Sequence, residues 1–307
     1  MQRYYSLSTY LKSKYGKKVY KLPIDGGFSC PNREQNTACI FCSDQGSGEF
    51  TTFGSIREQI RKQKQRLKHK KAESFIAYFQ SFTNTYAPIS VLRQRYEPLL
   101  EDPSIEVIDI ATRADCLNDE ILDFLSELNR KKDLWIEIGL QTTNDTVAET
   151  IQRGYPTELF FDVQKKLIDR GIPTIAHVIC GLPSESADSF LKTIDDLNDR
   201  SLFGIKIHSL YIQKNAPLYT MYRTCPFPLL TKEHYTDLVV QALERLENSV
   251  VIHRLTGDPE KSLLYEPVWC ADKLSVIGEI QKKLKDRNTY QGKKKEERKN
   301  YETSYGA

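Results

Sequence analysis

Short apolar runs alternate along the chain with longer stretches in which apolar residues recur every three or four positions. The runs are typical of buried strands and the stretches of amphipathic helices. Six runs predict strands at residues 18–25, 74–80, 105–111, 134–140, 174–181 and 205–211. The helical spacing predicts helices at residues 56–71, 89–101, 118–130, 146–152, 158–170, 185–198 and 232–247.

Six strand–helix units in sequence predict parallel strands joined by right-handed crossovers. A closed barrel needs eight such units. The expected fold is therefore α/β, a partial (β/α)6 TIM-like barrel with one open side. A doubly wound open sheet is the alternative, but no G-x-G-x-x-G motif follows the first strand, which argues against a nucleotide-binding unit of that kind.

The alternation weakens after residue 250. The sequence VVIHRLTG predicts one more edge strand, residues 259–267 a loop, and residues 272–286 a helix. From residue 289 to 307 the chain is polar and has little to bury. We expect a barrel core at residues 1–255 and a short helical C-terminal extension with a basic tail at residues 256–307.

Composition bears on location. Apolar residues make up 39% of the chain but never run for the 18 positions that indicate a membrane-spanning helix. The first 18 residues contain no apolar segment typical of a secretory signal. Seven cysteines without a framework spacing favour a reducing compartment. We therefore expect a cytoplasmic protein without a membrane partner.

The net charge of +3 conceals two basic segments. Residues 57–71 carry eight Lys or Arg against one Glu, and residues 282–299 carry nine against three acidic residues. The rest of the chain is net acidic. Two concentrated basic segments on an acidic body suit a protein that binds the phosphate backbone of a nucleic acid. The alternative is a solvated helix face and a polar tail.

Candidate chemistry centres on a loop after the first predicted strand. Cys30, Cys39 and Cys42 follow the spacing C-x8-C-x2-C in a loop rich in Asn, Ser and Gly. Three thiolates suit a 4Fe-4S cluster whose fourth iron has no protein ligand. The alternative is a structural zinc closed by a distant Cys or His, but the loop holds no fourth ligand and the chain no second C-x2-C.

Phe41, directly before the last of these cysteines, resembles the aromatic residue in the cluster loop of radical S-adenosylmethionine (SAM) enzymes. Their common spacing is C-x3-C-x2-C; the longer gap resembles the YtqA/YhcC-like family, which is related to the elongator-type radical SAM enzymes. The resemblance covers roughly residues 3–295. It rests on FIAYFQSFTNTYAP (75–88), IATRADCL (110–117), IEIGLQTTND (136–145), HVICGLPSES (177–186), IKIHSLYIQ (205–213) and VIHRLTGDP (251–259).

The resemblance implies a 4Fe-4S cluster on Cys30, Cys39 and Cys42, and SAM bound at its open iron. SAM would be cleaved to a 5′-deoxyadenosyl radical, with an electron from a donor such as flavodoxin or ferredoxin. The cofactor-binding positions that match are Gln80, Ser81, Arg113, Gln141 and Gly181. Gln80 and Ser81 stand where many relatives carry a GGE-like motif, which is absent here.

Two strands contribute candidate catalytic residues. Lys206 and His208 alternate onto one face of the strand at 205–211, and His177 lies on the neighbouring strand. We expect this face to line the barrel interior, where these side chains would position substrate or move a proton. The alternative for each histidine is a satisfied place in the core. The remaining cysteines, at 116, 180, 225 and 270, are expected to be core or loop thiols.

The resemblance further implies tRNA as the substrate, at the C5 side chain of the wobble uridine, in maturation of an aminomethyl-type group. Two alternatives stay open. One is a radical SAM enzyme acting on a small metabolite or a peptide. The other, of a different class, is a zinc-stabilised nucleic-acid-binding protein.

Overall fold

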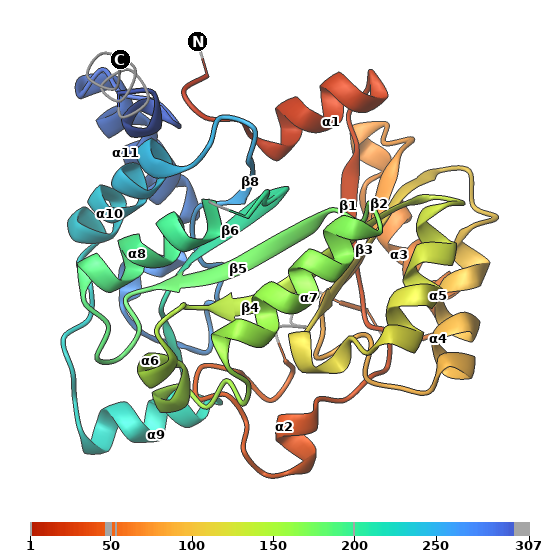
Figure 1. Cartoon of the computed structure of the whole chain (residues 1–307), viewed down its shortest axis with the longest axis horizontal. Coiled ribbons are helices and arrows are strands. Elements are labelled where there is room, and N and C mark those ends of the chain that lie inside the picture. Colours follow the sequence, from red (N-terminus) through yellow and green to blue (C-terminus); the bar gives the residue numbers. More distant parts are fainter. Residues whose placement is uncertain (1, 47–50, 53, 199, 298–307) are drawn as a thin grey trace, which may run out of the picture.

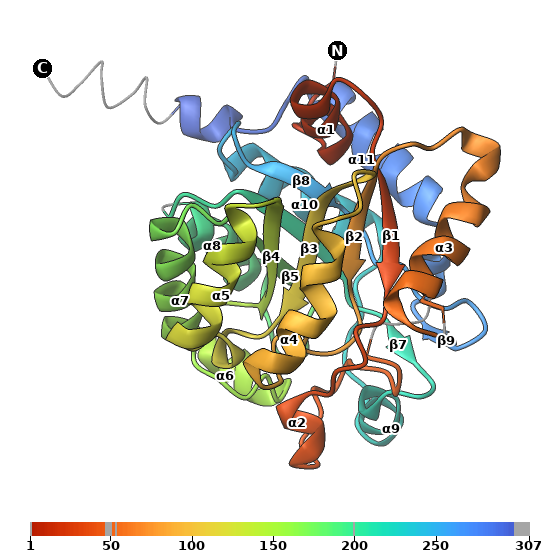
Figure 2. The same ribbon diagram turned by 90° about the vertical axis from the view of Figure 1, so that its right-hand side faces the viewer.

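The computed structural model covers the whole chain and describes residues 2–46, 51, 52, 54–198 and 200–297. One parallel sheet forms its centre, with strands in the order β1-β2-β3-β4-β5-β6-β8. The sheet curls into an open half-barrel (Figures 1 and 2), which confirms the predicted fold. Its strands are β1 Tyr20–Ile24, β2 Phe75–Phe79, β3 Ile105–Thr112, β4 Asp133–Gln141, β5 Thr174–Cys180, β6 Gly204–Ser209 and β8 Val251–Arg254.

Each predicted strand lies within two residues of its observed ends, and the extra edge strand after residue 250 is β8. The expectation of six barrel strands is thus extended by one. Buried strands are easy to find in the sequence because both faces of a parallel sheet are covered. β2, for example, is buried at all five positions.

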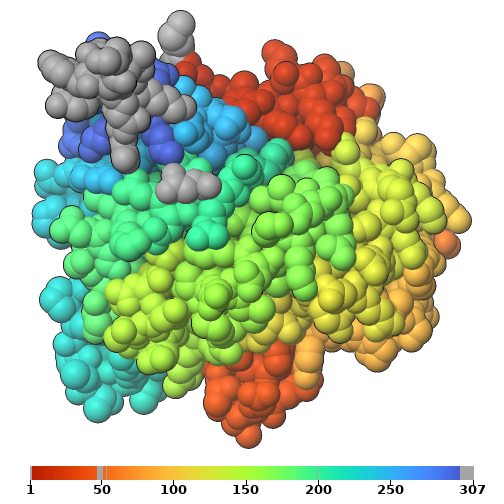
Figure 3. Space-filling view, viewed as in Figure 1, coloured from red at the N-terminus to blue at the C-terminus, as the bar shows by residue number. Residues whose placement is uncertain are grey.

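Helices on the outer side cover the convex face of the sheet, and the space-filling view shows them as a continuous layer (Figure 3). The helix α5 illustrates their construction: Asn118 caps its first turn, and the predicted apolar stripe at Ile121, Leu122, Leu125 and Leu128 is buried. These helices are α3 Ile56–Arg66, α4 Ile89–Tyr96, α5 Asp119–Asn129, α7 Thr157–Asp169, α8 Ala187–Asn198 and α10 Lys232–Arg245.

Two of the predicted helices are shorter than expected. The helix α3 ends at Arg66 and continues as the 3-10 turn η1 Lys68–Lys70. The helix α4 gives way at Tyr96 to the turn η2 Glu97–Leu99, because Pro98 has no backbone N–H with which to continue the helix. Further short turns are η3 Ala114–Cys116 and η4 Val268–Ala271.

An unpredicted helix, α1 Leu7–Tyr15, closes the amino end of the half-barrel (Figure 2). Its Tyr10 ring packs edge-on against Trp135 and Phe203, with centroid distances of 5.9 and 5.2 Å. Leu11 is buried in the same cluster. The helix is hard to recognise in the sequence because tyrosines, rather than an aliphatic stripe, make up much of its buried face.

Further elements surround the carboxyl ends of the strands. Residues 259–267, expected to be a loop, contain β9 Leu264–Glu266, which pairs antiparallel with β7 Ile212–Gln213. Three short helices lie on the same side: α2 Pro31–Glu34, α6 Asp145–Thr150 and α9 Pro217–Thr224. These pieces are too short for periodicity to reveal them.

The C-terminal helix α11 Lys273–Asp286 packs on α10, as its buried Val276, Ile280 and Leu284 indicate. The residues after it correct the expectation of a tail with little to bury. Thr289 and Gln291 are buried, and the Gln291 amide donates to the carbonyls of residues 247 and 250 at 2.7 and 2.8 Å. The division of the chain at residue 255 stays a prediction.

None of the described helices combines the length and apolar character that crossing a membrane requires.

The closure by α1 leads to a stability prediction. Replacement Leu11→Ala should lower the free energy of unfolding by about 2–5 kcal/mol, the usual effect of truncating a buried leucine. Urea titration followed by circular dichroism measures the effect. Leu274→Ala is the matched control, since Leu274 is 82% exposed on α11. It should change stability by no more than about 0.5 kcal/mol. Equal effects of the two replacements would contradict the closing role of α1.

Candidate functional site

A cavity of about 210 Å³ lies within the half-barrel, at the carboxyl ends of the strands. Ligand sites of β/α barrels lie at this end because the loops that follow the strands gather there. The three cysteines of the loop after β1 line the cavity, together with residues from β2 to β8. Among the predicted site residues, the lining includes Cys30, Cys39, Cys42, Gln80, Arg113, Gln141, His177 and His208.

The cysteine loop is held by backbone contacts from two other segments. The amide of Asn32 donates to the carbonyls of Gln152 and Arg153 at 2.9 and 3.3 Å. The N–H of Ile40 donates to the Ile151 carbonyl at 3.2 Å, and the Ile40 carbonyl accepts from Leu218 N–H on α9 at 2.7 Å. The loop is therefore fixed between the turn after α6 and the start of α9.

The turn after α6 approaches the cysteine loop so closely that it requires glycine. Gly154 has φ +88°, and a Cβ there would lie 2.7 Å from Asn32 Oδ1 and 3.0 Å from Arg113 Nη2. Arg153 holds the turn from behind: it is 1% exposed and donates to the carbonyls of Leu140, Thr142 and Tyr155 at 2.7–2.9 Å.

The three cysteines form no disulfide and are half-buried. Burial and the neighbouring Cys42 and Cys30 thiols raise the pKa of Cys39 to about 12, although the Arg113 guanidinium opposes the shift. These neighbouring thiols can become thiolates only with a strong positive partner, which a metal cluster supplies. The three sulfurs are thus suited to bind a metal cluster.

The donor set distinguishes a cluster from a single ion. A structural zinc needs four donors around one ion. The loop after β1 brings three thiols to the cavity wall, and three thiolates are the donor set of a 4Fe-4S cluster with one iron left without a protein ligand. The chemistry of these residues therefore fits a cluster better than a structural zinc ion.

The predicted cofactor-binding residues occupy different places. Arg113 donates to both Asp115 oxygens at 2.9 and 2.8 Å, so its guanidinium is fixed at the cavity wall. Gln141, with φ +63°, also lines the cavity. Ser81 is buried and Gly181 lies against Leu230; neither is among the lining residues. The roles of all of these in binding SAM stay predictions.

A buried carboxylate organises the interior wall. Glu137 on β4 is 1% exposed and accepts from Lys206 Nζ, from His177 Nε2 at 2.8 Å and from Lys21 Nζ at 3.2 Å. It therefore joins β1, β5 and β6 across the half-barrel. The structure thus brings His177 and Lys206 together through a residue that the sequence analysis missed.

A second carboxylate and a phenol extend this network. Lys21 Nζ donates to Asp109 on β3 at 2.7 Å, and Lys206 Nζ donates to Tyr78 on β2 at 2.8 Å. Both ammonium groups also lie over the Tyr78 ring, 4.2 and 4.3 Å from its centroid. The signal in the sequence was an acidic residue in the middle of an apolar strand, in VIDIA and in WIEIG.

His208 lies beside this network, with its ring centroid 5.5 Å from that of His177. Lys206 itself does not line the cavity and is 2% exposed. Arg254, on the edge strand β8, completes the wall, and no described carboxylate lies within ion-pair distance of it. The interior wall is therefore polar on every strand from β1 to β8.

Burial and charge shift the pKa values here. Burial lowers the pKa of Lys206 to about 7 and that of His177 to about 4, against the attraction of Glu137. Burial raises the pKa of Asp109 to about 7. Burial would also raise the pKa of Glu137, but Lys206, Lys21 and His177 together hold it well below its usual range. At neutral pH His177 is neutral and Glu137 is ionised.

Comparison with known proteins supports the family assignment. A model described as the radical SAM superfamily matches residues 28–197, and one described as the Radical_SAM C-terminal domain matches residues 203–286. The uncharacterized protein YtqA of Bacillus subtilis is 39% identical over 95% of this chain and 92% of its own. The tRNA uridine(34) acetyltransferase of Methanocaldococcus jannaschii is 20% identical over 58% of this chain and 32% of its own.

Among solved structures, the archaeal Elp3 of Methanocaldococcus infernus superposes with a TM-score of 0.70 over 89% of this chain and 64% of its own. At 15% identity, this likeness establishes the fold alone.

The central place of Glu137 leads to a prediction. Glu137→Gln leaves Lys206 without its buried counter-charge, whereas Lys21 keeps Asp109. The replacement should lower the free energy of unfolding by about 3–5 kcal/mol, the usual effect of breaking a buried ion pair. Replacing both partners, as Glu137→Met with Lys206→Met, should cost less than the single Glu137→Gln change because no buried charge of the pair is left alone. Chemical denaturation measures both. A double variant that is less stable than the single one would contradict this account.

Proposed function

The chain belongs to the radical SAM superfamily, and from this membership we propose that it modifies tRNA at the C5 side chain of the wobble uridine. Enzymes of this superfamily use a 4Fe-4S cluster and SAM. The observation that carries the proposal is the placement of Cys30, Cys39 and Cys42 and the polar interior wall around one cavity.

In this proposal, Cys30, Cys39 and Cys42 would hold the cluster, and SAM would bind to it. The chemistry that the two cofactors would supply is cleavage of a C–S bond of SAM by an electron from an external donor, which gives a radical able to take a hydrogen atom from the substrate. The seven cysteines form no disulfide. This suits a reducing cytoplasm, with flavodoxin or ferredoxin as the electron donor.

Residues at the cavity wall would bind and orient SAM. Arg113, fixed by Asp115, presents a guanidinium beside the cysteine loop, where it would pair with a carboxylate. Gln80 and Gln141 add polar side chains at the cavity wall. Ser81 and Gly181 would act from behind the wall, through backbone position.

The two histidines would accept or donate a proton during the reaction. His177 donates Nε2–H to Glu137, so its Nδ1 remains an acceptor while the ring is neutral. His208 lies next to it at the cavity wall. Lys206 is a positioning residue that acts through Glu137.

Support for tRNA comes from the distant likeness to the tRNA uridine(34) acetyltransferase. A base can reach an enclosed cavity only if it leaves the stack, and anticodon bases are the least constrained in this respect. The second candidate is a small metabolite or a peptide as substrate.

The first prediction here concerns the cluster. Anaerobically prepared Cys30→Ala, Cys39→Ala and Cys42→Ala variants should each lose most of their iron, their visible absorption and their production of 5′-deoxyadenosine under dithionite. Cys225→Ala is the matched control, since Cys225 is an exposed thiol outside the loop, and it should retain all three. Unchanged iron content in the loop variants would contradict the assignment of the three cysteines as ligands. Wild-type protein that contains zinc but no iron or sulfide would contradict the assignment as a radical SAM enzyme.

The second prediction concerns the substrate. In tRNA from cells that lack the gene, wobble uridines should accumulate an incompletely processed C5 side chain. Mass spectrometry of tRNA nucleosides measures it. Wild-type protein should restore the profile, and the Cys42→Ala variant should not. A profile identical to that of the parent cells would favour the metabolite or peptide substrate.

A further inference from the structure

The two basic segments of the sequence have different environments in the structure. In the C-terminal segment, four of the described lysines and arginines pair with carboxylates of α10 or of the turn after it. Lys283 and Arg287 both pair with Asp237, Lys294 pairs with Glu244 at 3.3 Å, and Lys295 pairs with Glu247 at 3.3 Å. These ion pairs neutralise the four side chains. The C-terminal segment is therefore a weaker candidate for binding an anionic partner than the sequence suggested.

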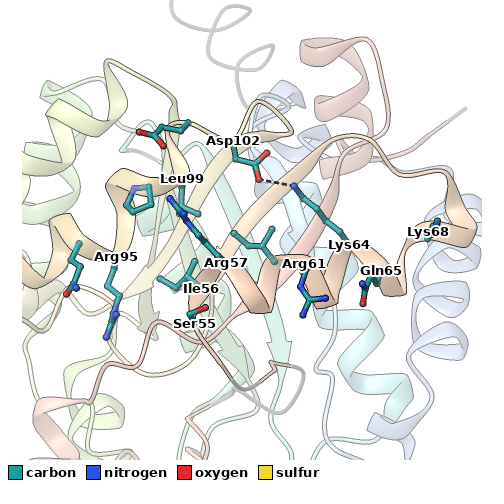
Figure 4. Close-up of a pocket in the computed structure, with 14 residues that line it drawn as sticks. Ser55, Ile56, Arg57, Arg61, Lys64, Gln65, Lys68, Arg95, Leu99 and Asp102 are labelled. Atoms are coloured by element: carbon teal, nitrogen blue, oxygen red, sulfur yellow. Dashed lines mark hydrogen bonds and ion pairs between the residues drawn. The ribbon is translucent and has the colours of Figure 1, made fainter.

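The first basic segment forms one wall of a groove on the outside of the half-barrel. The groove has a volume of about 850 Å³ and lies between α3 and the α4–η2 segment (Figure 4). Its lining includes five basic side chains: Arg57, Arg61, Lys64, Lys68 and Arg95. On the helix α3 and the turn after it, positions 57, 61, 64 and 68 recur every three or four residues and so share one side.

Among the described residues, one of these five cations forms an ion pair. Lys64 pairs with Asp102 at 2.8 Å, the contact drawn as a dashed line in Figure 4. For Arg57, Arg61, Lys68 and Arg95, no described carboxylate lies within ion-pair distance. In addition, the Nε of Arg95 is buried and has no hydrogen-bond partner among the described residues. The groove is therefore a concave surface with an excess of positive charge.

The groove lies beside residues that connect β1 with the helix α3. The helix α3 begins at Ile56, and its N-cap, Ser55, lines the groove. It packs along β1, where Gln59 and Gln63 donate to the carbonyls of Asp25 and Pro23. Because β1 is an edge strand, this side of the half-barrel is open.

Arg95 links the groove to the loop. A Cβ at Gly27 would lie 3.8 Å from Arg95 Nη2, so the guanidinium is next to the residues that lead into Cys30. A chain that leaves the cavity over the β1 edge would therefore meet Arg95 first and the α3 cations next.

We propose that this groove binds the phosphate backbone of the RNA whose nucleotide enters the cavity; this inference rests on the proposed function. Guanidinium groups bind phosphate oxygens through two parallel hydrogen bonds, and three of the four unpaired cations are arginines. Consecutive phosphates of an RNA backbone could therefore each contact a successive cation along the groove. The groove thus sets which RNA binds and how strongly, while the cavity sets the chemistry.

The test compares tRNA binding by three proteins across a range of salt concentrations. The groove variant combines Arg57→Gln, Arg61→Gln and Lys68→Gln. The control combines Lys283→Gln, Lys294→Gln and Lys295→Gln, which removes the same charge from the paired segment. Circular dichroism and formation of 5′-deoxyadenosine without tRNA verify that all three proteins are folded and loaded.

The expected result is a large loss of affinity for the groove variant alone. Each lost phosphate contact lowers the slope of log K against log salt by about 0.7–0.9, so three contacts lower it by about 2–3. The control should keep a slope within about one of the wild type, the value of a single contact.

Other outcomes overturn the inference in distinguishable ways. Loss of binding in the control but not in the groove variant would place the backbone on the C-terminal segment and leave the tRNA substrate standing. Equal losses would show that the groove has no special role. A wild-type protein that binds tRNA weakly and without salt dependence would remove the tRNA substrate and the groove together. Binding of the wild type, but not the groove variant, to phosphatidylserine vesicles without any tRNA binding would identify a membrane surface instead.

Discussion

A buried charge must be balanced where it lies, and the interior of this half-barrel is arranged around that constraint. Glu137 is nearly inaccessible to solvent, yet it stays ionised because two ammonium groups and an imidazole converge on it. Lys21, His177 and Lys206 come from three other strands, so the ion pairs also connect the sheet. With Asp109 and Tyr78 as further partners, every strand from β1 to β6 contributes one side chain.

The cysteine loop depends on a second kind of fixation, made mostly of backbone contacts. The loop after β1 is bound to the turn after α6, and that turn is held by the buried guanidinium of Arg153. Gly154 allows the approach because no side chain stands between the two segments. A cluster bound to three cysteines needs such a frame, since its ligands must be placed before iron binds and must stay in place during electron transfer.

Charge on the outside of the barrel is balanced in some places and not in others. In the C-terminal segment, Lys283, Arg287 and Lys294 pair with carboxylates of α10. In the groove beside α3, no described carboxylate lies within ion-pair distance of four of the five cations. A concave surface with unneutralised cations suits an anionic partner, and in our proposal that partner reaches the cavity over the open β1 edge. In this proposal, the reaction takes place in the cavity, and the groove recognises the RNA.

The sequence by itself determined the strand–helix alternation, the open half-barrel and the cysteine spacing, because each is written in residues that are near one another. A buried parallel strand produces a local apolar run, and a cluster loop keeps its ligands within a dozen residues. Only the tertiary structure decided which polar side chains meet. Glu137 and Lys206 are 69 residues apart, and Lys21 and Asp109 are 88 apart, so no local pattern connects them. The same holds for the two basic segments: their sequences look alike, but only the fold sets carboxylates against several cations of one and places Arg57, Arg61 and Lys68 of the other in a groove, because ion pairing depends on which helices pack together.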